Sequence, residues 1–324
     1  MSAPTSGIPL QGSPGRKFRP PRWLRIVVSN RLGLAGVLLL VVVAFTAIFG
    51  PLLMPGDPNA FVANPNLPPS REHWLGTTGL GQDVFHQLVA GTRTTISVAV
   101  IVGLLTALIA AAVAMISAFY GGIVDEILSL ITNVFLIIPG LPLMITLAVF
   151  LPSGMVTIAL VLTVAGWAFG ARYLRSQALS VRERDFVASQ IVSGERPWRI
   201  MFVEILPNML GVLMAYLINQ LVYAIGAQAA LEFLGLGAPN QVTWGTMMYW
   251  SVNNMSLLQG TWWTFVAPGL AIATISAALT LVNYIVDEAS NPRLRASRSL
   301  RKFLRSLPAS AYDPGRATIV VRHD

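Results

Sequence analysis

The chain has 324 residues, of which 54% are hydrophobic and only 11% are charged, and its formal net charge is +8. Ordinary soluble domains carry about 25% charged residues and have no place for so much apolar surface. The composition therefore excludes an ordinary soluble protein and predicts an integral membrane protein. The absence of cysteine excludes disulfides, thiolate metal sites and cysteine catalysis.

Six uncharged stretches predict transmembrane helices. Each has 17 or more residues without Asp, Glu, Lys, Arg or His, and a helix needs about 20 residues to cross the hydrocarbon core. Because no ten-residue alternation occurs, we expect an all-α polytopic membrane protein with six transmembrane helices rather than a β-barrel. The six stretches are Leu32–Met54, Thr94–Ala118, Ile127–Leu151, Met155–Ala171, Ile205–Leu231 and Thr264–Val286.

The basic residues predict the orientation of the chain. Of the 22 Lys and Arg residues, all except Arg71 and Arg93 lie in the two tails or in the loop after the fourth stretch. The positive-inside rule places these three segments in the cytoplasm. Nucleic-acid binding is disfavoured, because the charge is divided among short membrane-flanking segments. The predicted organisation is a disordered basic cytoplasmic tail (1–30), a first transmembrane helix (31–54), an extracytoplasmic loop (55–93), a five-helix core (94–290) and a cytoplasmic C-terminal tail (291–324).

The charged loop at residues 172–204 carries the strongest functional signal. Gly194 suits a left-handed helix end, and Pro197 suits the first turn of a following helix. Trp198 and Ile200–Phe202 are large apolar residues that a merely solvated loop does not need. We therefore expect a short helix–turn–helix that projects from the membrane and enters a groove on a soluble partner.

Other residues predict structural features. Pro139 and Pro142 flank Gly140 and predict a kink or break in the third span. The outer segment 232–263 contains tryptophans that are typical of an interfacial aromatic belt; these are Trp244, Trp250, Trp262 and Trp263.

Polar residues allow several interpretations. A metal site at His73, Asp83 and His86 is one hypothesis, but helix capping or surface solvation is favoured. The polar side chains inside the spans fit a neutral pathway or, in the favoured interpretation, interhelical hydrogen bonds; they are Asn133, Asn219, Gln220, Gln228 and Asn283.

Enzymatic activity is not supported by any motif. A phosphate-binding loop needs a lysine, and neither Lys17 nor Lys302 stands in that context. The predicted spans hold no carboxylate or His, and neither H-E-x-x-H nor G-x-S-x-G occurs. We expect no metal, no bound cofactor and no catalytic residue in this chain. An ion-coupled carrier or a non-catalytic membrane scaffold remains a remote alternative.

Five ordered segments resemble the C-type permease subunit of dipeptide/oligopeptide ABC importers. One is the charged loop, through Gly194 and Leu206-Pro207-Asn208. The others are HWLGTTGLGQDVFHQLVAGTRTTISV, FYGGIVDEILSLITNVFLIIPGLPLMI, ALEFLGLGAPNQVTWGTMM and DEASNPRLR. The loop departs from the family's E-A-A pattern, because Ala188-Ser189-Gln190 stands there.

The resemblance implies a type I ABC importer permease fold in the inner membrane of a bacterium or archaeon. It implies a second homologous permease, two ATPase subunits that bind the ATP and an extracytoplasmic substrate-binding protein. Peptides are the favoured solute, and oligosaccharides or nickel are the alternatives. The ATPase-coupling residues would be Arg184, Asp185, Phe186, Gly194, Glu195, Pro197, Trp198, Arg199, Glu204 and Pro207. The segment facing the binding protein would contain Glu232, Phe233, Gly235, Gly237, Trp244 and Gly245.

Overall fold

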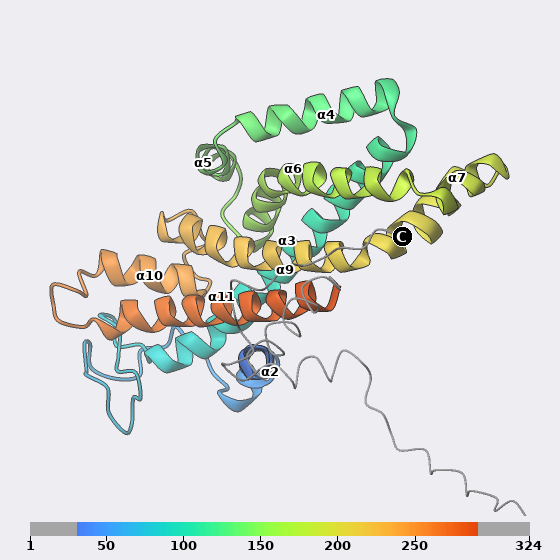
Figure 1. Cartoon of the computed structure of the whole chain (residues 1–324). Helices are drawn as coiled ribbons and strands as arrows, with labels where there is room; N and C mark the ends of the chain where they lie inside the picture. Colours follow the sequence, from blue (N-terminus) through green and yellow to red (C-terminus); the bar gives the residue numbers. More distant parts are fainter. Residues whose placement is uncertain (1–30, 291–324) are drawn as a thin grey trace, which may run out of the picture.

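The computed structural model describes residues 31–290, so both predicted tails lie outside the described residues (Figure 1). Within this range the chain is helical, apart from loops and one isolated bridge between Thr77 and Asp83. The elements are α2 (Arg31–Leu53), α3 (Val84–Tyr120), α4 (Gly122–Ile137), α5 (Gly140–Phe150), α6 (Met155–Arg182), α7 (Asp185–Val192), α8 (Pro197–Arg199), the π-helical η1 (Ile200–Ile205), α9 (Leu206–Phe233), α10 (Trp244–Asn253) and α11 (Trp263–Ser290).

The all-α polytopic fold is confirmed, with one sharply bent span. Among residues 31–290, five helices are long and apolar enough to cross a membrane, and α4 with α5 forms a sixth candidate that is bent by 89°. The predicted break occurs at Pro139. A residue before proline avoids the helical region, and Ile138 accordingly has an extended ψ of 127° that ends α4.

Two helices extend beyond the predicted spans. Asp83 caps α3 by accepting a hydrogen bond from the His86 N–H at 2.8 Å, so α3 includes the last residues of the expected loop 55–93. This hydrogen bond confirms the favoured capping interpretation for Asp83, which also pairs with His73 (Nδ1 to Oδ2, 2.7 Å). At the other end of the bundle, α6 continues to Arg182. The charged loop therefore begins at Glu183, later than the expected boundary at 172.

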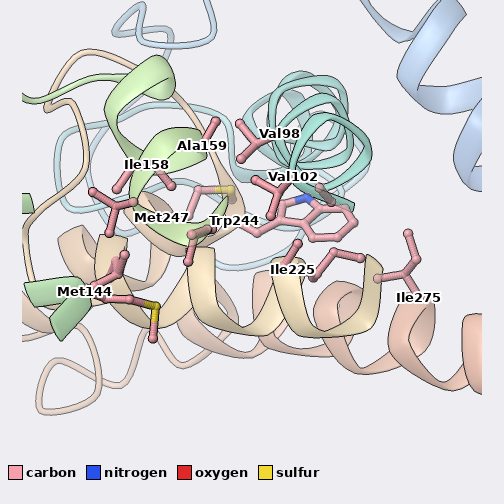
Figure 2. Close-up of a cluster of buried hydrophobic side chains, with 14 of the residues drawn as sticks. Val98, Val102, Met144, Ile158, Ala159, Ile225, Trp244, Met247 and Ile275 are labelled. Atoms are coloured by element: carbon pink, nitrogen blue, oxygen red, sulfur yellow. The ribbon is translucent and has the colours of Figure 1, made fainter. Parts of the chain in front are cut away.

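The core lies where α3, α6 and α9 pack together, with α10 and α11 closing one side. Alanines such as Ala107, Ala110 and Ala114 are buried along α3, and small residues allow membrane helices to approach closely. Figure 2 shows Trp244 among side chains from several helices, including Val98, Val102 and Ile225.

The tryptophans of the outer segment do not form a single belt. Trp250 and Trp262 are exposed, but Trp244 and Trp263 are buried. The Trp263 Nε1–H donates a hydrogen bond to the Thr77 carbonyl. The expectation of an interfacial belt is therefore wrong for these two side chains, which hold the outer segment onto the bundle.

The two ends of the bundle have different architectures. At one end, α7 extends beyond α6 and α9 (Figure 1). At the opposite end lie α10 and the loop that joins α2 to α3. The two segments that the sequence marks as functional thus lie at opposite ends of the helices.

Candidate functional site

The loop that the resemblance assigns to ATPase coupling, here called the coupling loop (residues 183–205), has the turn at Gly194 and the helix start at Pro197 that its sequence predicts. Gly194 has a φ of +73°, which confirms the predicted left-handed turn after α7. A Cβ added there would meet no heavy atom within 4 Å, so glycine is favoured by the backbone conformation and not by lack of space. Pro197 begins α8, as predicted, and Glu195 pairs with Arg199 one helical turn later.

The inner side of the coupling loop is anchored in the bundle. Val187, Ile200 and Ile205 are buried. They belong to an apolar cluster that includes Leu174 and Ala178 of α6. Because these anchors lie on both sides of Gly194, the turn is held at a defined position relative to α6.

The outer side of the same loop exposes large apolar side chains. Val192 is 88% exposed and Trp198 is 55% exposed, and Phe202 and Val203 are also exposed. The neighbouring Arg184, Asp185 and Arg196 are exposed charges, which belong in water rather than in hydrocarbon. An apolar patch with a charged rim is typical of a protein–protein contact.

The other predicted coupling residues lie around this patch. Gly194, Pro197, Arg199 and Pro207 are exposed, and Phe186, Glu195 and Glu204 are half-buried. The structure adds the π-helical turn η1, which the sequence analysis did not predict. Pro207 is the signal for it, because proline has no N–H to donate to the Val203 carbonyl one turn earlier.

At the opposite end, a buried carboxylate fastens α10 to α9. Glu232 accepts hydrogen bonds from Gln228 Nε2 (2.9 Å) and from the Thr243 hydroxyl. Thr243 is also the N-cap of α10 and forms a capping box with Thr246. Gly245 completes this contact, because a Cβ there would lie 2.5 Å from Glu232 Oε2.

The residues expected to face a binding protein therefore divide into two groups. Phe233 and Gly235 are exposed. The structure places the others inside the protein, where they position the outer segment instead of presenting a surface; they are Glu232, Gly237, Trp244 and Gly245.

A cavity of about 520 Å³ lies beside α10, between the α2–α3 loop and the segment that follows α9. A chain of amides crosses its wall: Gln87 Nε2 donates to Gln82 Oε1 (2.9 Å), and Gln82 Nε2 donates to the Asn59 carbonyl (3.1 Å). Asn59 Nδ2 in turn donates to the Asn240 carbonyl (3.2 Å). The Asn59–Asn240 bond joins segments 181 residues apart, so no local sequence pattern predicts this cavity.

Polar side chains within the helices mostly serve local packing. Gln220 Nε2 donates to the Gly166 carbonyl of α6 at 3.0 Å, and Arg172 donates to Asn133. These two contacts confirm the predicted interhelical hydrogen bonds for Gln220 and Asn133 only. Gln228 bonds within α9, to Glu232. Asn219 bonds to its own helix through the Ala215 carbonyl. Among residues 31–290, no group of three or more His, Asp or Glu side chains is arranged to hold a metal ion.

The sequence matches two known protein families. The family described as the binding-protein-dependent transport system inner membrane component matches residues 99–296, which is more than half of the chain. The chain belongs to this family. A second family, the N-terminal TM domain of oligopeptide transport permease C, matches residues 22–69.

Curated relatives support the same assignment. The oligopeptide transport system permease protein OppC of Bacillus subtilis is 32% identical over 269 residues, which cover 82% of this chain and 87% of that protein. The dipeptide transport system permease protein DppC of the same organism is 32% identical over 285 residues, which cover 87% and 88%. A putative peptide permease protein of Brucella suis is 30% identical over 82% of this chain and 88% of its own length.

The fold resembles a chain of the MetNI methionine ABC transporter in inward-facing form. The TM-score is 0.50 at 20% identity, and the match covers 65% of this chain and 95% of that chain. This protein is thus a multi-pass inner membrane permease subunit of a binding-protein-dependent ABC importer, which confirms the resemblance stated from its motifs.

Proposed function

We propose that this permease imports di- or oligopeptides by ATP-driven alternating access. It would form the translocation path with a second homologous permease and work with two ATPase subunits and an extracytoplasmic binding protein. The names of its relatives, oligopeptide and dipeptide permeases, support peptides over oligosaccharides or nickel. The sequence carries no phosphate-binding loop, so ATP binding is assigned to the partner subunits.

The observation that carries this proposal is the two-sided coupling loop. Its inner side is anchored through Val187, Ile200 and Ile205, and its outer side exposes Val192 and Trp198. An anchored element with exposed apolar side chains suits a groove on an ATPase subunit. Because the loop continues α6 directly, a movement of the docked ATPase would move that helix.

Two variants of the full importer test this assignment. Gly194→Asp adds a charge at the turn, and Trp198→Ala removes an exposed aromatic anchor. We expect both variants to keep normal permease levels while uptake of a labelled dipeptide is lost and the ATPase dissociates or becomes uncoupled. Trp74→Ala is the matched control, because Trp74 is also an exposed tryptophan (67%) but lies in the α2–α3 loop at the other end of the helices.

The coupling assignment and the peptide assignment can each be overturned separately. Normal dipeptide uptake by Gly194→Asp membranes with the ATPase still bound would remove the coupling assignment. Uptake of labelled nickel or of an oligosaccharide, without dipeptide uptake, by the unaltered importer would replace the peptide assignment while leaving the coupling mechanism intact.

The proposed orientation places both termini and the coupling loop in the cytoplasm. Val192 and Leu258 are 88% and 86% exposed, so single cysteines there should be similarly accessible to a reagent. The cysteine-free chain gives no background. The permease is expressed without its ATPase, so that docking does not shield residue 192. In intact cells, an impermeant thiol reagent should then label Leu258→Cys and spare Val192→Cys, and permeabilised cells should show both. The reverse pattern in intact cells would overturn the orientation.

A further inference from the structure

Helix α4 is attached to the bundle in an unusual way. Of its 16 residues, only Thr132 is fully buried. Large apolar residues along it are exposed, including Ile123, Leu130 and Ile137. Apolar contacts fix α4 mainly near its C-terminal end, where Phe135 packs edge-on against Trp167 of α6 (ring centroids 5.2 Å apart) and Leu136 joins the same apolar cluster.

Polar contacts hold the N-terminal part of α4. The Arg175 guanidinium of α6 binds both carboxylate oxygens of Asp125: Nε donates to Oδ1 at 2.6 Å, and Nη2 donates to Oδ2. Ser117, near the end of α3, donates its hydroxyl to the same Oδ1. These three residues, here called the α4 clamp, join α3, α4 and α6. A two-pronged, charge-assisted contact fixes direction as well as distance.

A second polar contact lies farther along the same interface. Arg172, one turn before Arg175 on α6, donates to the Asn133 side chain of α4. Between the two contacts lies a cavity of about 190 Å³. Because side chains do not fill this space, this part of the interface between α4 and α6 depends on its hydrogen bonds rather than on close packing.

The backbone leaves α4 few other constraints. Gly121 and Gly122 join it to α3, and their φ angles are +64° and +50°. Residues with a Cβ adopt positive φ angles only at a cost, so two in succession favour glycine at both positions. At its other end, the break at Pro139 separates α4 from α5. A helix between a two-glycine turn and a proline break can move as a unit. The α4 clamp then ties the movement of α4 to that of α6.

The position of Arg175 connects the clamp to the coupling loop. Arg175 lies seven residues before Arg182, where α6 ends and the coupling loop begins, so the separation is about two helical turns. A helical segment of this length is stiff. A displacement of the coupling loop therefore reaches Arg175 directly, and reaches Asp125 through the bidentate pair.

We propose that the Asp125–Arg175 pair is a positioning element that makes the bent α4–α5 segment follow α6, and so transmits movement of the coupling loop to it. This inference rests on the proposed docking of that loop to an ATPase. In this mechanism the pair stays closed throughout the transport cycle.

Asp125→Asn and Arg175→Lys test the pair in the full importer. The first removes the charge with little change in shape, and the second keeps the charge but loses the two-pronged geometry. We expect dipeptide uptake to fall roughly tenfold, as for a lost charge-assisted contact, while ATP hydrolysis persists. The ratio of ATP hydrolysed to dipeptide imported should therefore rise. Glu126→Gln is the matched control, because Glu126 is the next carboxylate along α4 and is exposed; its ratio should not change.

A chemical cross-link distinguishes transmission from simple stabilisation. Cysteines at Asn133 and Arg172, joined by a short bifunctional thiol reagent, replace the second polar contact with a covalent one. In the Asp125→Asn background, the cross-link should restore the ratio, because α4 must again follow α6. With the clamp intact, the cross-link should leave uptake unchanged.

Three results would overturn the proposal. A parallel loss of permease, ATP hydrolysis and uptake, with the ratio unchanged, would reduce the pair to a structural role. Failure of the cross-link to restore the ratio would do the same. A cross-link that stops uptake in the chain with an intact clamp would show that the pair must open. Each of these can occur while Gly194→Asp still abolishes coupling, so failure of the clamp is distinguishable from failure of the coupling-loop assignment.

Discussion

The coupling loop and the outer segment 232–263 contain similar residues in opposite environments. Each has a tryptophan and a glycine that the motifs single out, but Trp198 is 55% exposed and Trp244 is 2% exposed. Gly194 is surrounded by open space, and Gly245 lies against Glu232. The same residue types thus form a contact surface in one region and an internal support in the other. Substitutions should affect coupling in the first region and stability in the second.

Substitutions of Trp244 and Trp198 should differ most in their effect on the free energy of unfolding. Trp244 packs against Val98 and Val102, and its Nε1–H donates to the Leu88 carbonyl at 3.2 Å. Trp244→Ala leaves a large cavity and should lower the free energy of unfolding by about 3–5 kcal/mol. Trp198→Ala should leave it nearly unchanged. Thermal unfolding of the purified permease in detergent measures both, and equal losses would abolish the distinction between the two regions.

Substitutions of Gly245 and Gly194 should differ less in their effect on the free energy of unfolding, and for a different physical reason. A Cβ at residue 245 would lie 2.9 Å from the Ala229 Cα as well as close to Glu232, so Gly245→Ala must displace backbone and should cost about 1–3 kcal/mol. Gly194→Ala meets no neighbour and should cost about 1 kcal/mol, from its positive φ alone. The same unfolding measurement applies. A larger loss for Gly194→Ala would contradict the described packing.

Glu232 and Glu195 provide a third comparison between the two regions. Glu232→Ala leaves Gln228 and Thr243 without their acceptor inside the protein and should cost about 1–3 kcal/mol. Glu195→Ala removes a largely solvated pair with Arg199 and should change stability by less than about 1 kcal/mol. We expect reduced membrane levels only for Glu232→Ala, as measured by quantitative immunoblotting against the unaltered protein. Similar levels of the two variants would show that Glu232 is not a structural support.

The smallest effect is expected at Ala188. This residue is exposed on α7, at the position where the resembling family has the glutamate of its E-A-A pattern. Ala188→Glu should change stability by no more than about 0.5 kcal/mol. Co-purification of the ATPase should be unchanged or improved, since the substitution restores the glutamate of the family's pattern. Loss of the ATPase would show that this importer is adapted to the alanine.

Local rules explain which features were predictable. The break at Pro139, the left-handed turn at Gly194 and the start of α8 at Pro197 follow from the backbone preferences of single residues, and all three are confirmed. The limits of the helices were less predictable. Hydropathy reports where a helix leaves the hydrocarbon and not where it ends, so α6 continues through Arg172 and Arg175.

By itself, the sequence determined the membrane class, the helical spans, the family and the glycine turn of the coupling loop, because each depends on composition or on neighbouring residues. Only the tertiary structure decided that Trp244 and Glu232 are internal and that Trp198 is exposed. It also decided that Asp125 meets Arg175, a residue fifty positions away. Burial and long-range pairing depend on how helices pack together, and identical side chains acquire opposite roles through that packing.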